Sequence, residues 1–100
     1  MLTWTPEELE KKLESGNNIF LKLWKPGCGA CKLSQPAVKR VQELYSDQYL
    51  FGEINAEEFP EILEIADTEV LPVFFLFKDK KLQNKQIGFK GQAKLQELFN

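Results

Sequence analysis

The sequence WKPGCGACK, residues 24–32, contains both cysteines of this 100-residue chain, three positions apart. It follows an apolar run typical of a strand and leads into a helix-like sequence. At a helix start, side chains at this spacing share a face, so Cys28 and Cys31 can reach disulfide geometry. The helix dipole and free backbone N–H groups stabilise a thiolate there and lower the pKa of the first cysteine. We therefore expect Cys28 to attack and Cys31 to resolve.

Two other uses of a cysteine pair are a structural zinc site and a permanent structural disulfide. A structural zinc site needs about four ligands, and the chain has two cysteines and no histidine. A permanent structural disulfide would close too short a loop to constrain the unfolded chain much. The preferred interpretation is therefore a redox-active pair that needs no metal and no other cofactor.

Length and composition predict a single globular domain over residues 1–100, because 43% of the residues are hydrophobic. Thirteen basic and fifteen acidic residues leave a net charge of −2 and are spread along the chain, which argues against a nucleic-acid partner. Residues 1–8 lack the pattern of a signal peptide, and no apolar stretch is long enough to span a membrane. The expected location is a reducing cytoplasm, where a CxxC motif is more often catalytic than structural.

The rest of the chain predicts alternating strands and helices. Strands are expected at Met1–Trp4, Ile19–Trp24, Tyr49–Asn55, Pro72–Phe77 and Leu82–Ile87. Helices are expected at Glu7–Leu13, Cys28–Tyr45, Glu58–Ala66 and Gln92–Phe99. This order predicts an α/β fold in which about four helices flank a central mixed sheet of four to five strands on both faces.

Three local features refine these elements. Thr5 and Glu8 form a capping-box pattern that opens the first helix. Pro36 should kink the second helix, whose buried face is expected to contain Leu33, Ala37, Val41 and Leu44. Charged residues interrupt two strands that are otherwise apolar, at Lys22 and Glu53. The plain alternative for Lys22 is a stem that packs while the amine reaches water.

Several anchors in register resemble the thioredoxin family over nearly the whole chain. The residues that carry the resemblance are Trp24, four positions before Cys28, then CGACK at 28–32, which resembles Cys-Gly-Pro-Cys-Lys, Pro36, Leu71-Pro72 and Gly88. The resemblance implies the thioredoxin fold, a cis peptide bond before Pro72 that faces the disulfide, and a glycine loop at Gly88. It also implies a thiol–disulfide oxidoreductase.

The resemblance further implies a client-binding groove. Its expected positions are Trp24, Gly27, Gly29, Ala30, Leu71, Pro72 and Gly88, although plain core packing would also explain the tryptophan. This chain departs from the family at Gly27, which replaces a tryptophan, and at Ala30, which replaces a proline. It also departs at 68–70, where the family usually has an apolar residue, then often a basic one, then a small one. These departures concern the choice of clients rather than the chemistry.

By alignment, Lys22 takes the place of the family's buried aspartate, and Glu53 takes the place of the lysine that partners it. The signs of this pair are therefore exchanged. We expect both residues to modulate charge or proton transfer at the site, next to the catalytic Cys28 and Cys31.

The expected reaction begins when the Cys28 thiolate attacks a client disulfide, and it ends when Cys31 releases the reduced client. The expected partners are disulfide-containing client proteins and a thioredoxin-reductase-like or dithiol electron donor, and the protein itself is expected to be a monomer.

Two alternative functions stay open. One is an interaction module with minor redox activity, and the other is a glutaredoxin-type enzyme acting on glutathione adducts. The Leu71-Pro72 pair and the CGAC motif look closer to thioredoxin than to the glutaredoxin motifs.

Overall fold

The computed structural model describes residues 1–100 and contains a five-stranded sheet in the order β1-β3-β2-β4-β5. The strands are β1 at Leu2–Thr3, β2 at Ile19–Trp24, β3 at Leu50–Asn55, β4 at Val73–Lys78 and β5 at Lys81–Ile87. Strands β1, β3 and β2 run parallel, whereas β4 is antiparallel to β2 and β5 is antiparallel to β4. The predicted mixed sheet is confirmed.

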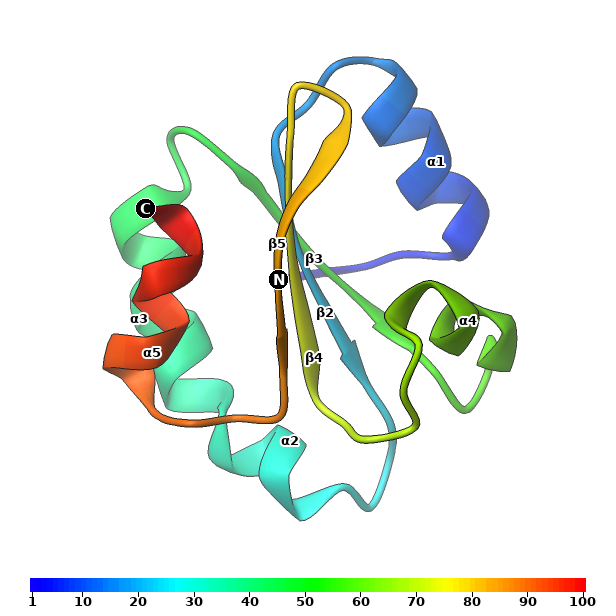
Figure 1. Cartoon of the computed structure of the whole chain (residues 1–100), viewed down its shortest axis with the longest axis vertical. Coiled ribbons are helices and arrows are strands. Elements are labelled where there is room, and N and C mark those ends of the chain that lie inside the picture. Colours follow the sequence, from blue (N-terminus) through cyan, green and yellow to red (C-terminus); the bar gives the residue numbers. More distant parts are fainter.

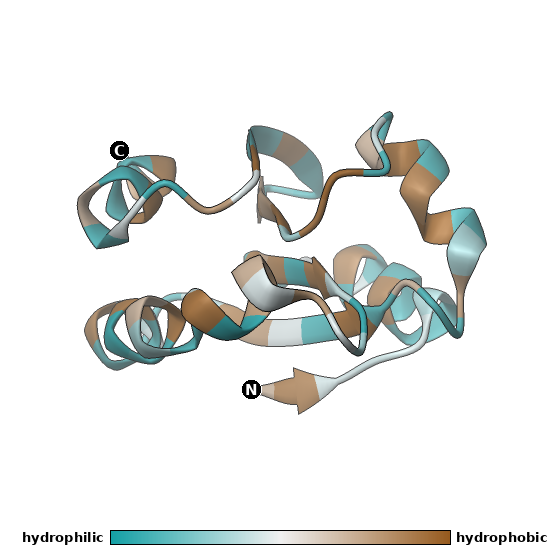
Figure 2. Ribbon diagram, turned by 90° about the horizontal axis from the view of Figure 1, so that it is seen from below, coloured by the Kyte–Doolittle hydropathy of each residue, from teal (hydrophilic) through white to brown (hydrophobic).

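Helices cover both faces of this sheet (Figure 1). They are α1 at Pro6–Glu14, α2 at Gly29–Leu33, α3 at Gln35–Tyr45, α4 at Leu63–Ala66 and α5 at Gln92–Gln96, with 3-10 turns η1 at Pro60–Ile62 and η2 at Glu97–Phe99. Helices α3 and α5 lie on one face, and α1 and α4 lie on the other. Hydrophobic and hydrophilic residues alternate along their turns (Figure 2), as expected for helices that pack one side against a sheet. None of the helices has the length and apolar character needed to cross a membrane.

The first helix begins as its sequence predicts. The backbone N–H of Glu8 donates to Thr5 Oγ1 at 3.1 Å, and the backbone N–H of Thr5 donates to Glu8 Oε1 at 3.2 Å. Pro6 occupies the first helical position, where its missing N–H costs nothing. The capping box therefore fixes the place where the chain turns into α1.

The helix predicted at Cys28–Tyr45 is divided into α2 and α3 at Ser34, which explains why the structure has five α-helices instead of about four. Pro36 lacks an N–H, and its ring conflicts with the preceding turn, so the helical hydrogen bonding is interrupted and α3 begins with Pro36 in its first turn. The buried stripe also differs from the predicted one, because Cys31, Ser34, Val38 and Val41 are buried at helical spacing on both sides of the break. Leu33 is 73% exposed and Leu44 is exposed as well, whereas Ala37, Val38 and Val41 pack against the sheet.

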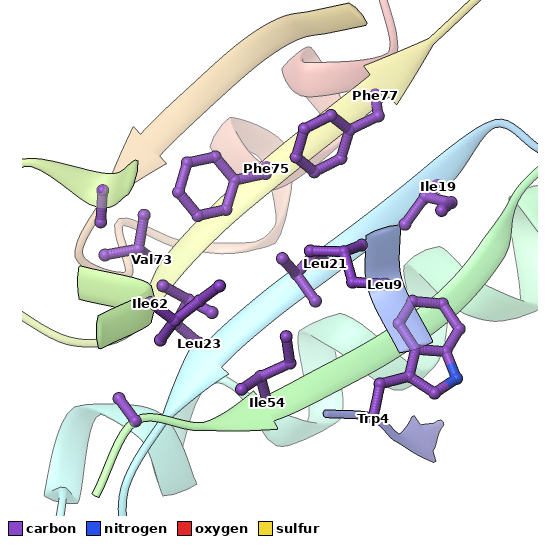
Figure 3. Close-up of a cluster of buried hydrophobic side chains, with 12 residues drawn as sticks. Trp4, Leu9, Ile19, Leu21, Leu23, Ile54, Ile62, Val73, Phe75 and Phe77 are labelled. Carbon is purple, nitrogen blue, oxygen red and sulfur yellow. The ribbon is translucent and has the colours of Figure 1, made fainter. Parts of the chain in front are cut away.

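Two clusters of buried apolar side chains hold the sheet and the helices together. The first core cluster has 12 residues, among them Leu9 of α1 and Ile54 of β3 (Figure 3). The second core cluster has 10 residues on the opposite face, including Val41 of α3 and Leu95 of α5. Each cluster thus joins one face of the sheet to its own helices.

Gly52 of β3 is required by the packing of Trp4. A Cβ atom at position 52 would overlap the six-membered ring of the Trp4 indole. The indole belongs to the first core cluster and is almost fully buried. The glycine therefore lets an aromatic ring lie directly on the backbone of β3.

Candidate active site

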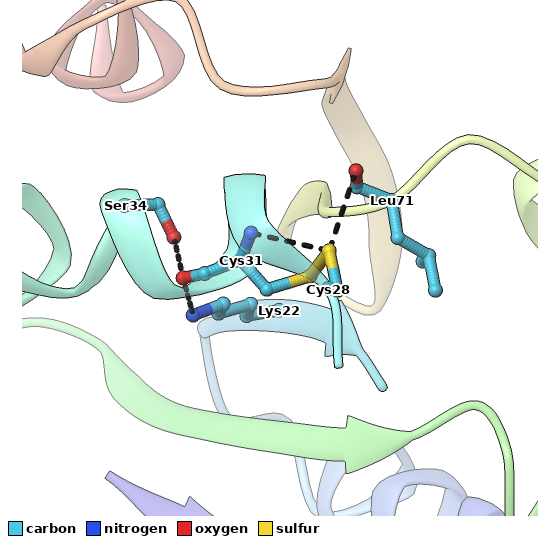
Figure 4. The surroundings of a disulfide bond; sticks show 5 residues. All are labelled: Lys22, Cys28, Cys31, Ser34 and Leu71. Carbon is cyan, nitrogen blue, oxygen red and sulfur yellow. Dashed lines mark hydrogen bonds between the residues drawn. A yellow bond between two sulfur atoms is a disulfide. The ribbon is translucent and has the colours of Figure 1, made fainter. Parts of the chain in front are cut away.

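The site is built around a disulfide between Cys28 and Cys31 at the start of α2, whose Cα atoms lie 5.3 Å apart. Cys28 is the N-cap of the helix in an extended conformation, and the backbone N–H of Cys31 donates to its Sγ at 3.2 Å (Figure 4). Cys28 is partly exposed, whereas Cys31 is 3% exposed. Of the two sulfur-bearing residues, solvent therefore reaches mainly Cys28.

A loop distant in sequence completes one side of the site. The Leu71-Pro72 peptide bond is cis, as the resemblance implied. The carbonyl oxygen of Leu71 lies 3.8 Å from Cys28 Sγ (Figure 4). Gly88, with a φ of 82°, donates its N–H to the carbonyl of Pro72 at 2.7 Å. The fold thus brings three of the expected client-binding residues to the disulfide.

The remaining expected client-binding residues lie on the same segment as the cysteines. Gly27, Gly29 and Ala30 are all exposed. Gly27 has a φ of 78°, a conformation that favours glycine, and a Cβ there would meet no atom within 4 Å. Trp24 ends β2 half-buried, and its Nε1 is buried without a hydrogen-bond partner. Gly27, Gly29 and Ala30 therefore place no large side chain beside the partly exposed Cys28.

A hollow of about 190 Å³ adjoins the disulfide. Its lining includes both cysteines and Trp24, together with Lys22 from β2 and Glu53 from β3. Lys25 and Lys32 also line it, and both of their side chains are exposed. The two charged residues that interrupt the predicted strands thus belong to the surroundings of the disulfide.

Lys22 is buried beneath α2 rather than extended to water, so the interpretation of a solvent-reaching amine is wrong. The residue is 3% exposed, and its Nζ donates to the carbonyl oxygen of Cys31 at 3.1 Å (Figure 4). Lys22 and Glu53 face each other in the register of β2 and β3. They form no ion pair within 4.0 Å, since the two such pairs in the structure lie elsewhere. Burial lowers the pKa of Lys22 below 10.5, and the Glu53 carboxylate partly raises that pKa again.

The comparisons with known proteins agree with this geometry. The whole chain, residues 1–100, matches the Thioredoxin family model. The chain belongs to the thioredoxin family. Thioredoxin from Mycoplasma genitalium is 27% identical to it over 94 residues, which cover 94% of this chain and 91% of that protein. Thioredoxin from Bacillus subtilis is 27% identical over 82 residues, covering 82% and 79% of the two chains.

Solved structures give the same fold. The oxidised form of mitochondrial thioredoxin 3 from Saccharomyces cerevisiae superimposes with a TM-score of 0.86 at 23% identity, covering 97% of this chain and 91% of that one. Thioredoxin NaTrxh from Nicotiana alata superimposes with a TM-score of 0.82 at 20% identity, covering 96% and 86%. Family membership and the Cys28–Cys31 disulfide together make this thioredoxin-family protein a thiol–disulfide oxidoreductase.

One buried residue of this thioredoxin-family site was not singled out from the sequence. Ser34 is fully buried, and its hydroxyl donates to the carbonyl oxygen of Cys31 at 2.7 Å. Serine side chains within helices commonly bond to a carbonyl three or four positions earlier. A serine three positions after the second cysteine and two positions before a helix-breaking proline is the signal that would have identified it.

Proposed function

We propose that this oxidoreductase acts as a protein disulfide reductase, with Cys28 as the nucleophile and Cys31 as the resolving cysteine. The observation that carries the proposal is the asymmetry between the two residues. Cys28 is partly exposed, and its Sγ receives the backbone N–H of Cys31, a contact that favours its thiolate. Cys31 is buried, and its sulfur is bonded to Cys28 Sγ, which is the atom that a resolving cysteine attacks.

The reaction then has two balanced steps. The Cys28 thiolate attacks one sulfur of the client disulfide, so a Cys28–client bond forms while the client S–S bond breaks, and the leaving client thiolate takes a proton from water. The Cys31 thiolate then attacks Cys28 Sγ, the mixed disulfide breaks, and the second client thiolate leaves. The client gains two electrons, and the protein is left with the Cys28–Cys31 disulfide.

The client is expected to bind as an extended segment across the surface beside the disulfide. We expect the backbone of Leu71 to pair with such a segment, because its carbonyl lies next to Cys28 Sγ. The other proposed contacts are Trp24, Gly27, Gly29, Ala30, Pro72 and Gly88. Because three of these are glycines and one is an alanine, few side chains stand between a client and the attacking sulfur.

The reaction needs a donor that returns two electrons, which we propose is a dithiol or flavin-dependent reductase protein. One structural neighbour, with a TM-score of 0.85 at 22% identity, comes from a study of thiol resolution in a yeast mitochondrial 1-Cys peroxiredoxin through glutathione and thioredoxin systems. We include oxidised peroxidatic thiols among the candidate clients for that reason. We propose that the protein works as a monomer in a reducing compartment such as the cytoplasm, where reductant is available.

The test is the reduction of insulin disulfides by a small dithiol, with the protein present in catalytic amounts. Wild type should accelerate the reaction, and Cys28→Ser should abolish the acceleration. The matched variant Cys31→Ser should instead accumulate a mixed disulfide with insulin, visible by intact mass. No acceleration by wild type would favour the interaction module, and rapid turnover by Cys31→Ser would contradict the two-cysteine mechanism.

A further inference from the structure

Both buried polar side chains of the protein meet at one backbone atom. The buried residues include only two with polar or charged side chains, Lys22 and Ser34. Lys22 Nζ and Ser34 Oγ both donate to the carbonyl oxygen of Cys31, at 3.1 and 2.7 Å. Burying an amine is costly unless its surroundings compensate, so its position beside the resolving cysteine calls for an explanation.

The alternation of β2 directs Lys22 toward this cysteine. Phe20, two positions earlier on the same face, packs in the second core cluster with residues of α3 and α5. Lys22 follows it on that face, and its Nζ reaches the carbonyl oxygen of Cys31 in α2 (Figure 4). The lysine therefore sits between the sheet and the helix that carries Cys31.

The charges around Lys22 leave its amine only partly neutralised. Glu53 is the one acidic residue in the lining of the hollow that contains Lys22 and the two cysteines, and it makes no ion pair within 4.0 Å. Lys25 and Lys32 line the same hollow. A neighbouring hollow brings Lys39 of α3 and the N-terminal residue to Lys22 and Glu53. A positive charge at Nζ therefore lies at the backbone of Cys31, in the lining of the hollow that contains the disulfide, with a single carboxylate beside it.

We propose that the Lys22 ammonium stabilises the thiolate of Cys31 during the resolving step, and that Glu53 weakens this effect by partial neutralisation. The proposal rests on the roles given above to Cys28 and Cys31. After the mixed disulfide forms, Cys31 is the free thiol, and it must give its proton to water before it attacks Cys28 Sγ. Its burial disfavours the thiolate, and a nearby positive charge offsets that effect. Lys22 is thus a positioning residue that acts through Cys31.

The bond to the Cys31 carbonyl fits the charged form of Lys22. An ammonium is a stronger donor to a carbonyl than a neutral amine, and the Glu53 carboxylate raises the pKa of Lys22 against the lowering caused by burial. As the pH rises through that pKa, the positive charge is lost. The help that Lys22 gives to the Cys31 thiolate should then fade.

The test uses Cys28→Ser, in which Cys31 is the only thiol, and follows the titration of Cys31 by the ultraviolet absorbance of its thiolate. Adding Lys22→Met should raise the pKa of Cys31 and lower its thiolate fraction about tenfold at a given pH, the equivalent of one pKa unit. Lys22→Gln should also raise the pKa of Cys31, although its amide can still donate a hydrogen bond to the Cys31 carbonyl. Glu53→Gln should shift it in the opposite direction.

Lys25→Met is the matched control, because it removes an exposed positive charge from the same hollow. Lys25→Met should shift the pKa of Cys31 by less, and this shift should disappear at high salt. The shift in the Cys31 pKa caused by Lys22→Gln should persist at high salt. A purely structural lysine predicts an unchanged Cys31 titration in Lys22→Gln, which would overturn the proposal. Shifts of the same sign in Lys22→Gln and Glu53→Gln would overturn it as well.

The two proposals fail separately. If wild type does not reduce insulin, the reductase assignment fails whatever the Cys31 titration shows. If wild type reduces insulin but neither Lys22→Gln nor Glu53→Gln shifts the titration, only the role of Lys22 fails. If Lys22→Met does not fold, Glu53→Gln still tests the proposal, because Glu53 is only half-buried. The proposal then requires that Glu53→Gln lowers the pKa of Cys31.

Discussion

The two faces of strand β2 are both buried, yet they serve different purposes. On one face, Ile19, Leu21 and Leu23 all join the first core cluster (Figure 3). On the other face, Phe20 joins the second core cluster, but Lys22 then lies beneath Cys31 (Figure 4). Burial alone does not distinguish the two faces. The difference teaches that one face of a strand can change within two residues from core packing to contact with the cysteine segment, where we propose that Lys22 acts on Cys31.

The largest expected effect is on the packing face. Leu21→Ala should lower the free energy of unfolding by about 2–5 kcal/mol, because it leaves a cavity in the first core cluster. Denaturant titration of the oxidised protein measures this loss. The Cys31 titration in the Cys28→Ser background should stay unchanged, since Leu21 points away from α2. A shift of that titration by Leu21→Ala would break the distinction between the faces.

A smaller loss is expected at Gly52, on the neighbouring strand. Gly52→Ala should cost about 1–3 kcal/mol of stability, because the added Cβ overlaps the Trp4 ring and forces it out of place. Gly29→Ala is the matched control for denaturant titration, since a Cβ there meets nothing within 4 Å. Equal effects of the two substitutions would contradict the close packing of Trp4 on β3.

On the other face of β2, removing the Lys22 charge should increase stability instead of lowering it. Lys22→Met should stabilise the oxidised protein by about 1 kcal/mol near neutral pH, because burial of the charge outweighs the attraction of Glu53. The folded protein has the lower pKa, so between that pKa and 10.5 the unfolded chain binds more protons, and wild-type stability rises with pH.

The advantage of Lys22→Met should therefore shrink as the pH is raised toward 10.5. Denaturant titrations of the two proteins at several pH values measure the difference. Lys25→Met provides the control, because an exposed lysine has little effect on stability. An advantage that grows with pH would show that Lys22 is stabilised by its surroundings in the charged form.

The strands and the cysteine pair were predictable because their signals are local. The apolar run at Ile19–Trp24 gives β2 with its observed bounds, and the spacing of Cys28 and Cys31 predicts their disulfide. The cis bond before Pro72 came only from the resemblance to thioredoxins, because most proline residues follow trans bonds. Local sequence pattern thus predicts β2 and the cysteine pair, and the family resemblance predicts the cis bond before Pro72.

The break between α2 and α3 was predicted only as a kink, and the predicted buried stripe was wrong at Leu33 and Leu44. The observed stripe of Cys31, Ser34, Val38 and Val41 continues at helical spacing across the break, and Leu33 lies outside it. The meeting of Lys22 and Ser34 at the Cys31 carbonyl joins a strand to a helix break. This contact depends on how the strand and the helix are arranged in space, which the periodicity and spacing of the sequence do not predict.

The most direct test of the central claim, that Lys22 makes one face of β2 part of the redox site, is the equilibrium of the Cys28–Cys31 couple with a glutathione buffer. The midpoint of this equilibrium is compared between wild type and Lys22→Gln, at a pH where the reduced protein carries one thiolate. A positive charge favours the reduced form that carries a thiolate, so Lys22→Gln should make the couple more reducing, with the oxidised fraction increased at every buffer ratio. The same midpoint in both proteins would contradict the account and leave Lys22 as a structural support of the Cys31 carbonyl.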